Sequence, residues 1–210
     1  MNYGSMKETT ADNIELGTFS AKDIAIAGSF AYLLSSRWSG GITLRFITSS
    51  IAGYNSIGIA SDLGLNYYDE ERGWSVSAVA KNLGGQVKAY QDEYEKIPID
   101  LQLGISKQLA AAPLRFSATL SRLNRWDTSF IQHLALGVDF FIGETIYIAG
   151  GYNFRRRDEM KVSDGDSNSS HGAGLSVGAG LTLKRFKLNA AYAKYHVSAS
   201  SIVINATYSL

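Results

Sequence analysis

Residues 171–184, HGAGLSVGAGLTLK, separate completely into two alternating sets. The odd-numbered set is apolar after its first member: His171, Ala173, Leu175, Val177, Ala179, Leu181 and Leu183. The even-numbered set is small or polar: Gly172, Gly174, Ser176, Gly178, Gly180, Thr182 and Lys184. This alternation is typical of an extended strand with one apolar face. A soluble sheet alternates too, but the length favours a membrane-crossing strand, which needs about 9 to 11 residues, whereas ordinary strands have about 5 or 6.

The two segments that follow repeat the pattern. In the first, one face carries Phe186, Leu188, Ala190 and Tyr192, and the other carries Lys187, Asn189, Ala191 and Ala193. In the second, one face carries Ile202, Ile204, Ala206, Tyr208 and Leu210, and the other carries Ser201, Val203, Asn205, Thr207 and Ser209. The carboxyl-terminal part of the chain is therefore predicted to consist of long amphipathic strands.

Composition narrows the class of protein. The 210 residues are 45% hydrophobic, yet no apolar run is long enough for a membrane helix, so a membrane protein of this sequence would have to be a barrel. The chain has no cysteine, which excludes disulfides, thiolate metal sites and cysteine catalysis. Its net charge of +1 gives no electrostatic case for binding nucleic acid.

The remaining strands are predicted from the same alternation. They are 2–9, 24–33, 42–48, 57–68, 74–81, 99–107, 114–123, 132–142 and 146–156. With the three strands above, this makes about twelve. Short and long links between them interleave, as expected for the periplasmic turns and extracellular loops of an outer-membrane barrel. We therefore predict an all-β fold, a transmembrane antiparallel β-barrel with about twelve strands, in one domain over residues 1–210, integral to the outer membrane.

The chain offers little for catalysis. Residues 174–178, GLSVG, match the G-x-S-x-G pattern of hydrolases, but that motif requires a strand-to-helix turn and here lies in the middle of a predicted strand. A barrel-wall hydrolase that uses His133 is a remaining alternative. We therefore expect that the protein is not an enzyme and that it binds neither a metal nor a cofactor.

Charged and polar side chains recur on the face opposite the apolar one. The predicted lumen-facing set is Arg45, Asp62, Lys81, Asp100, Arg115, His133, Asp139 and Arg155. Charges in a low-dielectric lumen must pair or stay hydrated, so this set indicates either an interior packed by ion pairs or a selective pathway. The basic cluster of Arg155, Arg156, Arg157 and Lys161 lies where a strand meets the outer surface. These residues are candidates for binding lipopolysaccharide phosphates, although a basic strand end is a simpler interpretation.

Several short motifs, in order and spacing, resemble one protein family. They are Tyr54-Asn55-Ser56, Ser61-Asp62-Leu63-Gly64-Leu65, Lys81-Asn82-Leu83-Gly84-Gly85, residues 97–104 (IPIDLQLG) and Ala112-Pro113-Leu114-Arg115-Phe116. The chain is similar to the PorV/PorQ outer-membrane proteins of the type IX secretion system, in particular to PorQ, which resemble FadL-like barrels. The resemblance implies about fourteen strands behind a signal peptide. We therefore expect this chain to be the carboxyl-terminal part of such a barrel, lacking the signal peptide and first strands.

The resemblance also implies a function. It predicts an anchor for a cell-surface attachment complex, with PorU, PorV and PorZ as partners and lipopolysaccharide as the molecule joined to secreted cargo. The alternative is a FadL-like transporter of hydrophobic small molecules. A transporter would have an apolar lumen, whereas an anchor would be plugged by charge pairs. Tyr90, Asp92 and Tyr94, in the long link 82–98, are candidate partner-binding residues, and a loop folded over the lumen is the competing interpretation.

Overall fold

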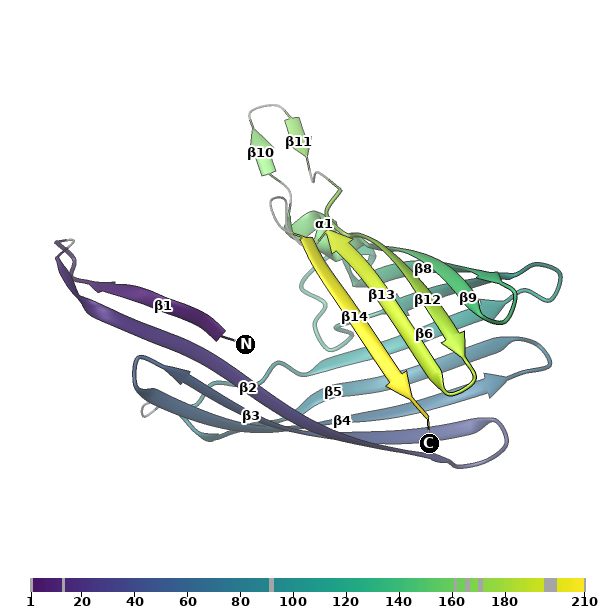
Figure 1. Cartoon of the computed structure of the whole chain (residues 1–210), viewed down its shortest axis with the longest axis horizontal. Coiled ribbons are helices and arrows are strands. Elements are labelled where there is room, and N and C mark those ends of the chain that lie inside the picture. The colour runs from purple at the N-terminus through teal and green to yellow at the C-terminus, as the bar shows by residue number, and fades with distance from the viewer. Residues whose placement is uncertain are drawn as a thin grey trace. The chain divides into compact units, whose positions relative to one another are not determined.

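Twelve antiparallel strands form one sheet in the computed structural model of the chain (Figure 1). The structure describes residues 2–12, 14–90, 93–160, 162–164, 167–169, 172–194 and 200–209. Neighbouring strands in the sheet are consecutive in the sequence except where a two-stranded hairpin, β10–β11, intervenes before β12. The predicted all-β fold and the number of main strands are confirmed.

The strands of the main sheet are β1 (Asn2–Thr9), β2 (Glu15–Leu33), β3 (Trp38–Ile51), β4 (Tyr54–Asp69), β5 (Trp74–Lys88), β6 (Asp100–Gln108), β7 (Leu114–Leu120), β8 (Leu134–Ile142), β9 (Ile146–Asn153), β12 (Leu175–Leu183), β13 (Phe186–Lys194) and β14 (Ser200–Tyr208). The hairpin consists of β10 (Val162–Asp164) and β11 (Ser167–Ser169). Two short helices, η1 (Phe130–His133) and α1 (Phe154–Glu159), accompany them. No helix of the described residues is long and apolar enough to span a membrane.

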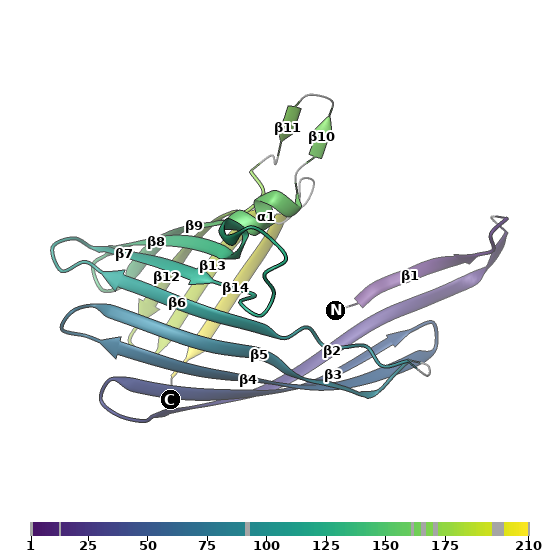
Figure 2. The same cartoon turned by 180° about the vertical axis from the view of Figure 1, so that it is seen from behind.

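The chain divides into two compact units. The first contains Met1–Leu65 and Val79–Asp100, and the second contains Asn66–Ala78 and Leu101–Leu210. In the second unit β12, β13 and β14 lie side by side, and the β10–β11 hairpin extends from the end of the sheet where α1 lies (Figures 1 and 2).

The exposure of the two faces is the reverse of that in a soluble protein. On β12, Leu175 and Val177 are each 50% exposed, whereas Ser176 and Gly178, on the opposite face, are less exposed. Among the described residues, the buried hydrophobic ones are only alanines: Ala21, Ala60, Ala89 and Ala173. The large apolar side chains therefore form no core and instead cover the outside of the sheet, where they require an apolar solvent. We call this the apolar face, and the other the polar face.

Several predicted strands begin or end differently in the structure, and the one predicted over 114–123 stops at Leu120. The strand predicted over 146–156 stops at Asn153, because the Asn153 side chain accepts a hydrogen bond from the backbone N–H of Arg156 (3.0 Å) and caps α1. Arg155 therefore lies in a helix and not on a strand. The strand predicted over 132–142 begins only at Leu134, and His133 belongs to η1.

Other strands are longer than predicted. β2 begins at Glu15 and β5 continues to Lys88, so the links predicted over 10–23 and 82–98 are shorter in the structure. Backbone pairing continues there without an apolar face, and a prediction based on apolar alternation cannot detect such extensions.

Candidate functional site

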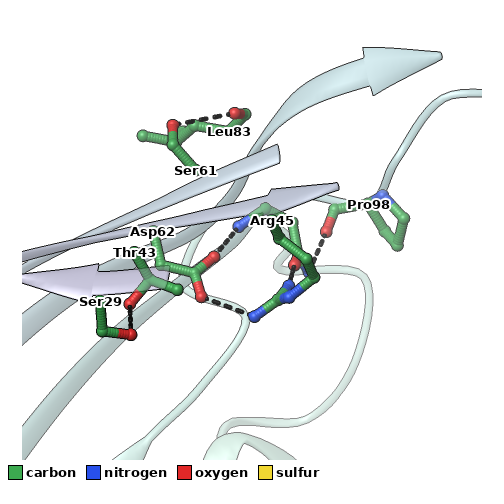
Figure 3. Close-up of polar contacts among 8 residues, drawn as sticks. Ser29, Thr43, Arg45, Ser61, Asp62, Leu83 and Pro98 are labelled. Carbon is green, nitrogen blue, oxygen red and sulfur yellow. Dashed lines mark hydrogen bonds and ion pairs between the residues drawn. The ribbon is translucent and has the colours of Figure 1, made fainter. Parts of the chain in front are cut away.

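A polar network joins three adjacent strands on the polar face of the first unit. The Arg45 guanidinium donates from Nη2 to Oδ2 of Asp62 (2.9 Å) and from Nη1 to Oδ1 of Asn82 (3.0 Å). The backbone N–H of Asn82 donates to Oδ1 of Asp62 (2.8 Å). The carboxylate thus binds the guanidinium and the β5 backbone at once (Figure 3). Both charged side chains are mostly buried and mutually compensated.

The β5 backbone departs from extended geometry within this network. Asn82 has φ +60°, a left-handed conformation that asparagine tolerates better than most residues. Two residues later Gly84 lies so close to β4 that an added Cβ would be 2.1 Å from the carbonyl oxygen of Ile59. The Asn82-Leu83-Gly84 sequence therefore allows β5 to bend tightly onto β4.

The segment 93–98, which we call the strap, is tethered to the same two strands. Gln86 accepts a hydrogen bond from the N–H of Glu95 (2.6 Å), and its amide donates to Ser56 Oγ (2.9 Å). Asn82 Nδ2 donates to the Pro98 carbonyl (3.0 Å). Cδ1 of Ile97 is 3.5 Å from the position that a Cβ on Gly58 would occupy.

Burial on β4 agrees with the position of the strap. Ser56, Gly58 and Ala60 are buried, although they face the less apolar side of the sheet. The strap thus packs against the polar face of β4, and Asn82 connects it to the Arg45–Asp62 ion pair.

Two candidate residues for partner binding lie beside or within the strap. Tyr90 is half-buried next to Ala89, whereas Tyr94 is 65% exposed. Asp92 lies outside the described residues. The tethering of 93–98 favours the competing interpretation, a loop folded against the polar face, for most of this segment; Tyr94 remains available to solvent.

A second ion pair lies on the polar face of the second unit. Arg115 on β7 donates from Nε to Oδ2 of Asp139 on β8 (2.8 Å), its partner in the strand register. The guanidinium carbon is also 5.3 Å from the centre of the Phe141 ring. Of the other predicted lumen-facing residues, Lys81 is half-buried on β5 beside Asn82, and Asp100 begins β6 and is half-buried.

His133 is buried away from the strands. Its Nδ1 is 2.8 Å from the Ser121 carbonyl, so this nitrogen carries the proton and donates. Its Nε2 is 3.3 Å from Thr128 Oγ1, and its ring packs 4.7 Å from that of Trp126. With both ring nitrogens engaged, His133 holds the link between β7 and β8 in place. Ser176 lies within β12 and not at a strand-to-helix turn, so the hydrolase context is absent.

A row of small, uncharged residues crosses the polar face of the second unit. Successive register partners on β7, β8, β9, β12, β13 and β14 are Ser117, Gly137, Gly151, Ser176, Ala193 and Ser201. Short side chains leave room beside this part of the wall, in contrast to the strap-covered part of β4.

The predicted basic cluster forms part of α1. Arg155 pairs with Glu159 (2.5 Å), Arg156 approaches the same carboxylate (3.6 Å), and Arg157 pairs with Asp158 (3.0 Å). The hydrogen bond from Arg157 to Asp158 raises the pKa of Arg157 above its ordinary value. Lys161 lies outside the described residues. All three arginines of α1 therefore take part in ion pairs within the helix.

Two residues of the strap network were missed at the sequence level. Asn82 and Gln86 fall in a stretch predicted as a loop, and their role depends on the course of the strap. An asparagine followed two residues later by glycine, directly after an alternating strand, is the one local signal for a bend there.

Antiparallel strands with an exposed apolar face and a polar opposite face define the class of this protein. The fold is that of an integral outer-membrane β-barrel. Among solved structures, the chain is similar to the Pseudomonas putida toluene transporter TodX, a FadL-family outer-membrane transporter. The TM-score is 0.53 at 12% sequence identity, over 92% of this chain and 70% of that one.

Other comparisons add no family assignment. No model of a known protein family matches the chain, and neither does any curated protein. The FadL-like part of the resemblance is thus supported at the level of the fold, whereas the PorV/PorQ part remains a prediction. The structural neighbour is a transporter and not an enzyme.

Proposed function

We propose that this chain forms the wall of an outer-membrane barrel that transports hydrophobic small molecules. The observation that carries the proposal is the fold shared with a toluene transporter over 92% of the chain. Fold similarity alone does not specify a substrate. Further support has to come from the side chains on the polar face.

The row of small residues supports a pathway in the second unit. Its members, from Ser117 to Ser201, carry no charge and project little from the wall. The nearby charges of Arg115 and Asp139 neutralise each other at 2.8 Å. An apolar solute beside this row would therefore meet neither a charge nor a bulky side chain.

The strap gives the first unit a different role. It lies on the polar face of β4, held by Gln86 and Asn82. A few hydrogen bonds of about 1 kcal/mol each hold it, and because they can be exchanged for water, the strap can open from β4.

Uptake by whole cells tests the proposal, because lipopolysaccharide makes the outer membrane the barrier to hydrophobic compounds. The full-length protein would be expressed in a bacterium from which its own transporters of hydrophobic compounds have been deleted. Radiolabelled toluene should enter these cells faster than cells that carry the empty vector. A control solute such as a small sugar should enter at an unchanged rate. Equal toluene uptake in the two strains would reject transport.

A second candidate is the anchor of a secretion complex. The motif resemblance favours it, as do the exposed Tyr94 and the two ion pairs on the polar face. Copurification of surface proteins with the full-length barrel from its native membrane distinguishes the two functions. Specific retention of secretion components together with unchanged toluene uptake would favour the anchor.

A further inference from the structure

Two aromatic side chains lie side by side on the polar face of the second unit, near the short link between β8 and β9. Phe141 on β8 and Tyr147 on β9 are register partners, and their ring centres are 6.2 Å apart with the ring planes tilted by 46°. This distance and tilt are typical of a favourable aromatic pair. Both side chains are half-buried, so part of each ring remains exposed on the polar face.

The Tyr147 ring is held over Gly180 on the neighbouring strand, β12. An added Cβ at Gly180 would overlap Cε1 of Tyr147, and Gly180 is buried, so the ring occupies the space that a side chain at this position would fill. The Tyr147 hydroxyl donates to Oδ1 of Asn189 on β13 (3.0 Å), and Asn189 is the register partner of Gly180. Because the hydroxyl proton is already donated, the ring is the part of Tyr147 that can contact a solute.

Phe141 is held by a different polar group. The Arg115 guanidinium carbon lies 5.3 Å from the centre of the Phe141 ring, and Nε of Arg115 donates to Oδ2 of Asp139 (2.8 Å). The charge beside the aromatic pair is therefore compensated by a carboxylate. Since both rings are positioned by contacts within the wall, little side-chain ordering would oppose the binding of a solute to them.

Short side chains flank Tyr147 on the side of the long links. Ala149 comes next on the same face of β9, its register partner on β12 is Gly178, and the partner of Gly178 on β13 is Ala191. The row of small residues follows two positions further along each of these strands. A solute beside the Tyr147 ring would therefore meet small, uncharged side chains on β9, β12 and β13.

We propose that Phe141 and Tyr147 bind the ring of an aromatic solute, and that Tyr147 makes the barrel select aromatic over aliphatic compounds of similar size. An aromatic solute gains edge-to-face or offset contacts with the two rings, in addition to the hydrophobic contact that an aliphatic ring also makes. These contacts correspond to a preference of about threefold to tenfold. The inference rests on the proposed transport function and narrows its substrate class.

Toluene and methylcyclohexane test the selection, because they share one carbon skeleton and differ in the π system of the ring. Uptake of each radiolabelled compound would be measured in the transporter-deleted strain that expresses the full-length protein, after subtraction of the rate with the empty vector. The ratio of the two rates within one strain does not depend on the amount of folded barrel. The unsubstituted protein should favour toluene about threefold to tenfold. Tyr147→Leu should bring the ratio close to one.

Three further variants locate the preference. Gly180→Ala should also lower the ratio, because the added Cβ displaces the Tyr147 ring without removing it. Phe141→Leu should lower the ratio in part, since one of the two rings remains. Tyr192→Leu is the matched control: Tyr192 is a tyrosine of the same unit, on β13, and its side chain is exposed on the apolar face. It should leave the ratio unchanged.

Other outcomes overturn the inference. A preference for toluene that survives in Tyr147→Leu would leave Tyr147 as a structural cover for Gly180. Equal uptake of the two compounds by the unsubstituted protein would remove the selection while transport itself stands. An equal loss of preference in Tyr192→Leu would show that the selection does not come from the aromatic pair. Uptake of neither compound above the empty-vector rate would reject the proposed transport function, and this inference with it.

Discussion

Arg45 and Asp62 meet at 2.9 Å across β3 and β4, and the same carboxylate receives the backbone N–H of Asn82 from β5. One ion pair therefore fixes the relative positions of three strands. Because its side chains are 28% and 15% exposed, the pair is neither fully desolvated nor freely hydrated. Its removal should cost more than that of a surface pair and less than that of a fully buried one.

The first prediction concerns this pair. Asp62→Ala should lower the free energy of unfolding by about 1 to 3 kcal/mol, because it leaves a guanidinium and a backbone N–H without their acceptor. Urea unfolding of the barrel in lipid vesicles measures the change. The double variant with Arg45→Ala should recover part of the loss, since no cation is then left unpaired. Additive losses in the two single variants would show that the pair has no coupling.

The two faces of the sheet could be predicted because apolar alternation is a local property. The sequence alone assigns Leu175, Val177 and Leu183 to the apolar face of β12. All three side chains are exposed in the structure. The partner of Arg45 could not be predicted in the same way. It depends on the register of β3 against β4 and on the bend at Asn82, neither of which alternation encodes.

The ends of strands and helices could not be predicted from alternation either. Arg155 continues the alternation of β9 in the sequence, but the cap provided by Asn153 starts a helix instead. The strap falls in the link predicted over 82–98, for which partner binding and a loop folded over the lumen were the two interpretations. Its position is set by hydrogen bonds with Gln86 and Asn82 on β5. Such tertiary contacts produce no repeating pattern in the sequence, so they could not be predicted from it.

The second prediction uses two adjacent glycines of β5. An added Cβ at Gly84 would overlap the backbone of Ile59 and Ala60, whereas one at Gly85 would meet nothing within 4 Å. Gly84→Ala should therefore destabilise the barrel by about 3 kcal/mol, and Gly85→Ala by much less. The yield of folded protein and the unfolding midpoint in urea measure the difference. Equal stability of the two variants would contradict the close approach of β4 and β5.

The third prediction tests which face meets lipid. Val177→Arg places a charge on the apolar face of β12 and should cost about 2 to 4 kcal/mol if the residue lies near the bilayer midplane. Val203→Arg is the matched control, since Val203 is one register row away on β14 and lies on the opposite face. It should cost much less. The comparison requires insertion of both variants into vesicles, and equal costs would refute the assignment of the faces.

The last prediction concerns the tether of the strap. Asn82→Gly keeps the left-handed backbone accessible but removes the side chain that binds Arg45 and the Pro98 carbonyl. The loss of about 1 kcal/mol from the tether should open the strap about fivefold more often. Trypsin cleavage after Lys96 should become faster by that factor. Asn66→Gly is the control, because Asn66 is also an asparagine on the neighbouring strand β4 and its side chain accepts a hydrogen bond from Ser75 (2.9 Å). Unchanged cleavage would show that Asn82 does not hold the strap.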